Sequence, residues 1–234
     1  MIRTLKSIKG DIFLQFKYGF YLVYTIVTIM YIFLLNFLPE EALIVIVPFI
    51  IFSDPSVLGF FFISGLVLLE KGEGVLEYLI ITPLQVKEYI ISKLVSLTFL
   101  SLITSIIIEF FSFGKNINYP IFLVGITLTS FLFILIGFIA VSRFPTINKY
   151  LLSSVGYIIV LCLPLIGYFG IFKSRLFYLF PTQASLLLIS GAFKGIDTWQ
   201  LIYSILYLLV WIAATFKIAN ISFYKYIILK KGDN

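Results

Sequence analysis

The sequence predicts an all-α, polytopic membrane protein with six transmembrane helices. Hydrophobic residues make up 61% of the 234 residues and charged residues only 12%, and the mean hydropathy is +1.12. A water-soluble domain needs a charged exterior that this composition cannot provide, so the bilayer is the expected solvent. Six apolar runs reach the ~20 residues that a ~30 Å hydrocarbon layer requires. They lie at about 18–38, 42–69, 89–111, 119–142, 150–170 and 199–221.

The first sixteen residues, MIRTLKSIKGDIFLQF, predict a short amphipathic helix, because apolar residues recur at helical spacing and basic residues lie off that stripe. The apolar set is Ile2, Leu5, Ile8, Ile12, Phe13 and Phe16. Such a helix lies in the headgroup plane. The alternative is a basic flank that only orients the first span. No cleavable signal peptide is expected, since the segment has no apolar centre followed by small residues.

The basic residues predict the orientation of the spans. If the N-terminus is cytoplasmic, thirteen Lys and Arg fall inside and four outside, which is the bias that cytoplasmic loops show. Both termini are therefore expected in the cytoplasm, and the chain in the cell membrane. The inside set is Arg3, Lys6, Lys9, Lys17, Lys71, Lys87, Lys93, Arg143, Lys149, Lys217, Lys225, Lys230 and Lys231, and the outside set is Lys115, Lys173, Arg175 and Lys194.

The second run is too long for a single straight span. Its 28 residues would reach about 42 Å at ~1.5 Å per residue, and Ser53-Asp54-Pro55-Ser56 interrupts it. Asp54 and Pro55 fit a helix start, with Asp as cap and Pro at the first helical position, which predicts a kink near the outer interface. An acid at membrane depth is alternatively a candidate for the transport path. We favour the cap because it explains both residues.

The third run is expected to start from a capping box, Thr82-Pro83-Leu84-Gln85, in which Thr82 is the N-cap and Gln85 lies three residues later. Near the outer end of this run, Glu109 is expected to point outward or to pair with Lys115, without a functional role.

The residues between the fifth and sixth runs, 171–198, form the longest segment predicted outside. Its second apolar piece, residues 184–193, is too short to span, so it should lie on the outer surface or re-enter part-way. No internal repeat or linker is visible, and residues 1–234 are interpreted as one transmembrane domain.

The chain lacks the residues that most catalytic sites require. It has no His and a single cysteine, Cys162, and it contains no glycine-rich loop ending in Gly-Lys-Ser or Gly-Lys-Thr. We therefore expect no catalytic, cofactor-binding or metal-binding residue and no enzymatic activity. Any ATP would have to be bound by another protein. A single break, at Asp54-Pro55, argues against ion-coupled transport, for which several such sites are usual.

Residues 70–88 are a polar island between two apolar runs. Glu70, Glu73 and Glu77 fall at helical spacing, while an apolar stripe occupies another face and Gly72 and Gly74 allow a turn. The stripe is Val75, Leu76, Leu79 and Ile80. The pattern predicts a short cytoplasmic amphipathic helix. It would either anchor the spans at the interface or dock a soluble partner, and acids near an anionic leaflet favour docking.

The same stretch resembles the first inner loop of ATP-binding cassette (ABC) transporter permeases of the type-2, exporter-type class. The matching residues are Glu70-Lys71, Gly74, Leu76-Glu77, Thr82-Pro83, Glu88-Tyr89 and Lys93, and two positions, Gly72 and Val75, depart from the family pattern. The layout is also similar to that of small drug or antibiotic export permeases, with an amphipathic first helix, six spans and a half-buried outer segment.

The resemblance implies a permease subunit coupled to a separate ATPase subunit through this loop, paired with an identical or sister permease. The implied coupling residues are Glu70, Gly74, Leu76, Glu77, Leu79, Thr82 and Pro83. Spans rich in Phe, Tyr, Ile and Leu suggest a hydrophobic or amphipathic cargo. An ion-coupled secondary transporter and a membrane scaffold without transport activity remain alternatives.

Overall fold

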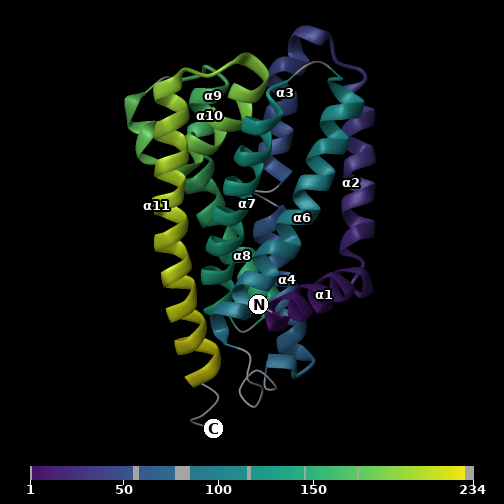
Figure 1. The fold of residues 1–234 in the computed structure, drawn as a ribbon, viewed down its shortest axis with the longest axis vertical. Helices are drawn as coiled ribbons and strands as arrows, with labels where there is room; N and C mark the ends of the chain where they lie inside the picture. Colours follow the sequence, from purple (N-terminus) through teal and green to yellow (C-terminus); the bar gives the residue numbers. More distant parts are fainter. Residues whose placement is uncertain are drawn as a thin grey trace.

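A computed structural model of the chain describes residues 2–54, 58–76, 85–114, 117–144, 146–172 and 174–229. All regular structure within these residues is helical, which confirms the all-α prediction (Figure 1). The helices are α1 (Ile2–Lys17), α2 (Phe20–Leu35), α3 (Glu40–Ser53), α4 (Gly59–Gly72), α6 (Val86–Ser112), α7 (Tyr119–Ser142), α8 (Ile147–Cys162), α9 (Pro164–Tyr168), the 3₁₀ helix η2 (Arg175–Leu179), α10 (Pro181–Lys194), α11 (Thr198–Phe223) and the π-helical turn η3 (Tyr224–Leu229).

The long helices run roughly side by side around α7, which packs against α4, α6, α10 and α11 (Figure 1). Two buried apolar clusters lie along the bundle, one around Phe138 and Phe223 and the other around Phe133 and Leu188. Gly137 allows α7 and α4 to approach closely. A Cβ atom at this position would stand 2.7 Å from the carbonyl oxygen of Phe60.

The prediction of a multi-pass membrane protein is confirmed, while the count of six spans is not. Within the described part of the chain, four helices are long and apolar enough to cross a bilayer: α6, α7, α11 and the α8–α9 segment. Counting α1 and α2, which are bent by 66°, as a single broken span brings the number to five. α3 and α4 have 14 residues each, about 21 Å at ~1.5 Å per residue, so neither alone reaches across the hydrocarbon layer.

Helix α1 confirms the predicted N-terminal helix and presents its apolar side away from the protein. Leu5, Phe13 and Phe16 are 55%, 69% and 61% exposed, whereas Asp11 and Gln15 are buried. The helix lies across one end of the bundle, and α11 ends at that same end (Figure 1). An exposed apolar side of this kind suits a helix that lies in the headgroup plane, and the interfacial position of α1 stays a prediction.

The predicted start of the third run is wrong in its capping residues. Helix α6 begins at Val86 with Gln85 as its N-cap, and the Gln85 N–H donates to the Glu88 carboxylate at 3.0 Å. Gln85 is therefore the first residue of the capping motif rather than its last. Thr82 and Pro83 lie outside the described residues.

The segment predicted to lie outside, residues 171–198, contains η2 and α10, and α10 packs against α3, α7 and α11. Thr182, Ser185 and Leu188 are completely buried there. This surrounding protein provides the shielding that a re-entrant backbone would need, because unpaired polar groups are costly in lipid.

Candidate coupling site and transport path

A buried ionic cluster lies where the cytoplasmic segment was predicted to leave the second span. Lys93 Nζ of α6 stands 2.5 Å from Glu70 Oε1 of α4 and 2.8 Å from Asp11 Oδ1 of α1. The Tyr89 hydroxyl donates to Glu70 Oε2 at 2.5 Å. Lys93 and Glu70 are 1% and 2% exposed, so both charges are removed from solvent. A single ammonium thus ties three helices together.

The α1 side of this cluster is a polar stripe, with Ser7, Asp11 and Gln15 spaced four residues apart and hence on one face. Ser7 hydrogen-bonds Ser92 at 3.1 Å, and the Gln15 amide donates to Ser96 at 2.8 Å. Helix α1 therefore contacts the bundle by its polar face and leaves its apolar face exposed. The polar stripe of Ser7, Asp11 and Gln15 was not identified from the sequence, although Asp11 is the only acidic residue in the otherwise basic segment 1–16.

Among the described residues, the ionic cluster joins two acidic side chains to one basic side chain. Two carboxylates, Asp11 and Glu70, share the one ammonium of Lys93, and Asp11 Oδ2 is buried without a hydrogen-bond partner among the described residues. Lys93 Nζ also lies 4.5 Å from the centre of the Tyr89 ring, within cation–π range. Removing the cation would leave two acids facing each other out of water, which is a costly arrangement.

The structure places only part of the predicted coupling set. Glu70 is buried in the ionic cluster, and Leu76 is 2% exposed in the apolar cluster with Tyr89 and Phe138. Both side chains therefore contact residues of their own chain, and their coupling to a partner stays a prediction. Gly74 has φ of +74°, the left-handed turn for which glycine was expected. The remaining members, Glu77, Leu79, Thr82 and Pro83, lie outside the described residues.

Asp54 is placed differently from its predicted helix-capping position. Its backbone is right-handed helical (φ −64°, ψ −60°) at the end of α3, whereas an N-cap residue is typically extended. The side chain is 1% exposed, and its Oδ2 accepts a hydrogen bond from the Thr104 hydroxyl of α6 at 3.0 Å. Oδ1 has no partner within the described residues. Asp54 is therefore a buried acid inside the bundle, and Pro55 lies outside the described part.

A cavity of about 480 Å³ lies between α2 and α6, with Thr104 in its wall. Its lining is mostly apolar, and it is partly open where Ile29, Ile103 and Ile107 reach the outer surface of the bundle. Tyr21 and Tyr24 contribute aromatic rings. The cavity was not predicted, because the pairing of α2 with α6 has no marker in the sequence.

Glu109 does not point outward as expected. It is 1% exposed, and its Oε2 accepts from the Tyr119 hydroxyl at 3.3 Å. Its predicted alternative partner, Lys115, lies outside the described residues.

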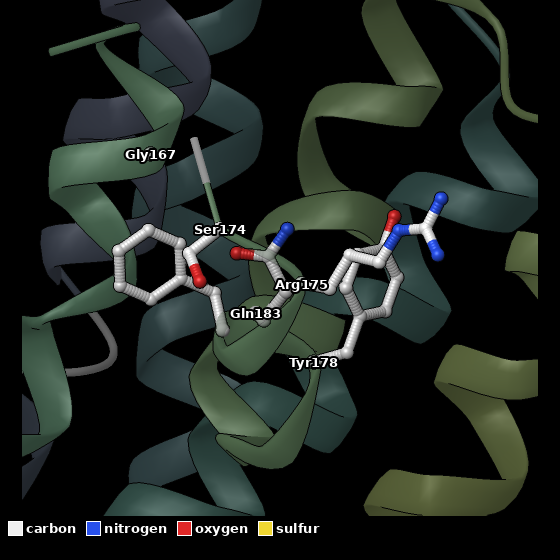
Figure 2. Close-up of a pocket in the computed structure, with 6 residues that line it drawn as sticks. Gly167, Ser174, Arg175, Tyr178 and Gln183 are labelled. Carbon is white, nitrogen blue, oxygen red and sulfur yellow. The ribbon is translucent and has the colours of Figure 1, made fainter. Parts of the chain in front are cut away.

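A second cavity, of about 340 Å³, lies in the outer segment between α9, η2 and α10. Ser174, Tyr178 and Gln183 surround it (Figure 2). It adjoins the exposed Arg175.

Apolar helices long enough to span a bilayer, together with polar clusters buried between them, define a multi-pass α-helical membrane protein. The chain belongs to the fluoroquinolones export permease protein family, whose model matches residues 2–231. It is 28% identical to fluoroquinolones export permease proteins of Mycobacterium tuberculosis strains ATCC 25618 / H37Rv and CDC 1551 / Oshkosh, over 99% of this chain and 99% of each relative. The family assignment confirms the resemblance to drug and antibiotic export permeases.

Proposed function

We propose that this chain is the membrane-spanning permease subunit of an ATP-binding cassette exporter, and that it carries an amphipathic antibiotic of the fluoroquinolone type. The family and the names of the two relatives support the export of such a cargo. The proposed coupling to an ATPase is supported mainly by the ionic cluster of Glu70, Lys93 and Asp11. This cluster connects the first residue of segment 70–88 to helices α6 and α1.

In this mechanism segment 70–88 enters a groove on the ATPase, and ATP-driven movement of the ATPase pulls on it. Glu70 passes the movement to α6 through Lys93, and Asp11 passes it on to α1. Leu76 keeps the segment seated in the apolar cluster, while Gly74 provides its turn. Glu77, Leu79, Thr82 and Pro83 are then the residues proposed to touch the ATPase.

The proposed topology has six passes, with α3 and α4 together forming the second. Both termini would be cytoplasmic. The excess of basic residues on that side supports this orientation, as does the position of α1 and the end of α11 at one end of the bundle. A second permease, identical or a sister chain, would complete the path. ATP would bind only to the ATPase subunits, and the permease itself would have no enzymatic activity.

The coupling proposal is tested by co-expressing the chain with ATP-binding cassette ATPase subunits from the same organism. Glu77→Lys should abolish co-purification and the stimulation of ATP hydrolysis. Glu41→Lys is the matched control, since Glu41 is an exposed acid in the first turn of α3, on the proposed outer side. Glu70→Lys is a poor test of contact because it would place a second cation beside Lys93. Unchanged binding and stimulation in Glu77→Lys would contradict the proposal.

A further inference from the structure

The cavity between α2 and α6 combines two properties that point to one kind of ligand. Its walls are apolar and aromatic, which suits a hydrophobic body. Directly behind the wall residue Thr104 lies the carboxylate of Asp54. We propose that this cavity binds an amphipathic aromatic cation, with Asp54 as the counter-charge. The proposal rests on the export function above and names the charge and location of its cargo site.

The need for a positive charge follows from the surroundings of Asp54. The ion pairs found among the described residues join Lys93 to Asp11 and Glu70, and Lys17 to Glu73, and none includes Asp54. One of its carboxylate oxygens has no hydrogen-bond partner within that same part of the chain. A buried acid without a cation is unfavourable, so a ligand that brings a positive charge would be stabilised there.

Thr104 can release the Asp54 carboxylate without losing its own hydrogen bonding. The Thr104 hydroxyl lies 3.0 Å from Asp54 Oδ2, but also 3.1 Å from the Leu100 carbonyl and 3.0 Å from the Ser101 carbonyl of the preceding helical turn. It can therefore donate to its own helix when a ligand takes its place at Asp54. The exchange leaves no hydroxyl unsatisfied.

The rest of the ligand is specified by the cavity walls. Tyr21 and Phe111 contribute aromatic side chains to the lining, and aromatic rings attract cations and stack on other rings. Ile29, Ile103 and Ile107 lie at the edge that is exposed on the outside of the bundle. A membrane-dissolved amphiphile would enter through this edge from the bilayer.

The experiment measures equilibrium binding of radiolabelled tetraphenylphosphonium to the purified full-length chain in lipid nanodiscs. Tetraphenylborate, a hydrophobic ion of similar size and opposite charge, is the control ligand. We expect saturable binding of the cation and at least tenfold weaker binding of the anion. Asp54→Asn should weaken cation binding by about tenfold or more, because it removes the negative charge that attracts the phosphonium electrostatically.

Two further variants separate a local effect from misfolding. Ile103→Trp, which fills the exposed edge of the cavity and keeps Asp54, should also weaken cation binding about tenfold. Glu109→Gln removes another buried acid of α6 that does not line the cavity, and should bind as the parent does. Equal binding by Asp54→Asn and the parent, equal binding of both ions, or no effect of Ile103→Trp would overturn the proposal.

A second copy of the chain could instead fill the cavity. Efficient disulfide cross-linking between copies through Ile103→Cys, in a Cys162→Ser background, would overturn the ligand site. Binding is measured without ATP and without an ATPase subunit. A chain that binds the cation but does not support ATP-driven transport would therefore contradict only the proposed function, and loss of specific binding would contradict only this inference.

Discussion

Replacing Lys93 by Met should strongly destabilise the protein, because Lys93 is the shared cation of two buried acids. Its ammonium lies 2.8 Å from Asp11, and at an effective dielectric constant of about 20 that pair alone is worth about 6 kcal/mol before desolvation is subtracted. Desolvation offsets much of this attraction. Breaking a buried pair from one side still costs about 3–5 kcal/mol, since the other charge remains buried without a partner.

The assay is thermal unfolding of the purified chain in detergent, followed by intrinsic fluorescence. For a chain of this size, a loss of 1 kcal/mol lowers the apparent Tm by about 2–4 °C, so Lys93→Met should lower it by roughly 10 °C. Lys93→Arg keeps the charge and should fall between Lys93→Met and the parent, because the larger guanidinium must fit a fully enclosed space.

The decisive comparison is a triple variant, Asp11→Asn, Glu70→Gln and Lys93→Met, which removes all three charges at nearly constant volume. It should recover most of the lost apparent Tm, because replacing a whole buried ionic group is far less costly than breaking it. An unchanged apparent Tm in Lys93→Met, or a triple variant as unstable as the single one, would refute this reasoning.

Three other perturbations have equally definite outcomes. Gly137→Ala should lower the free energy of unfolding by about 1–3 kcal/mol, because its Cβ would stand 2.7 Å from atoms of Phe60 and Ile63. The loss should appear as a lower apparent Tm. Gly156→Ala, with nothing within 4 Å, is the matched helical control, and equal behaviour of the two would contradict the close packing of α7 on α4. Leu76→Ala should lower the free energy of unfolding by about 2–5 kcal/mol, because Leu76 is buried. Leu152 of α8 is 80% exposed, so Leu152→Ala should lower it much less. Similar losses in the two variants would argue against the burial of Leu76. In a Cys162→Ser background, a nitroxide at Phe13→Cys should be relaxed by lipid-soluble oxygen, and one at Lys9→Cys by a water-soluble nickel reagent. The opposite pattern would show that α1 does not place its apolar face in lipid.

The long apolar helices and the amphipathic first helix could be predicted from the sequence. Apolar length alone located residues 119–142, which are the bounds of α7, and 199–221, close to those of α11. Helical spacing also predicted α1, since Leu5, Phe13 and Phe16 share an apolar face whether or not the rest of the protein is known. Local sequence patterns are enough to locate such helices, because apolar length and helical spacing do not depend on which other helices they pack against.

The candidate sites depend on pairing between distant helices, and no local pattern encodes such pairing. The local pattern placed Glu70 on the acidic face of an amphipathic helix, because its partners Asp11 and Lys93 are far away in the chain. Asp54 was assigned to a cap because Asp before Pro is a strong local motif, whereas its observed contact with Thr104 is a tertiary one. Buried polar residues in a membrane protein therefore need their partners identified before a role is given to them.

The central claim, that this permease is driven by ATP through a partner ATPase, is tested most directly by transport in proteoliposomes. The chain is reconstituted with an ATP-binding cassette ATPase subunit that co-purifies with it, and uptake of a fluorescent antibiotic of the proposed cargo class into inside-out vesicles is followed. If ATP hydrolysis drives export, uptake should require ATP, persist when proton and sodium gradients are collapsed, and disappear with Glu77→Lys. Uptake driven by an ion gradient without ATP would contradict this claim and favour a secondary transporter.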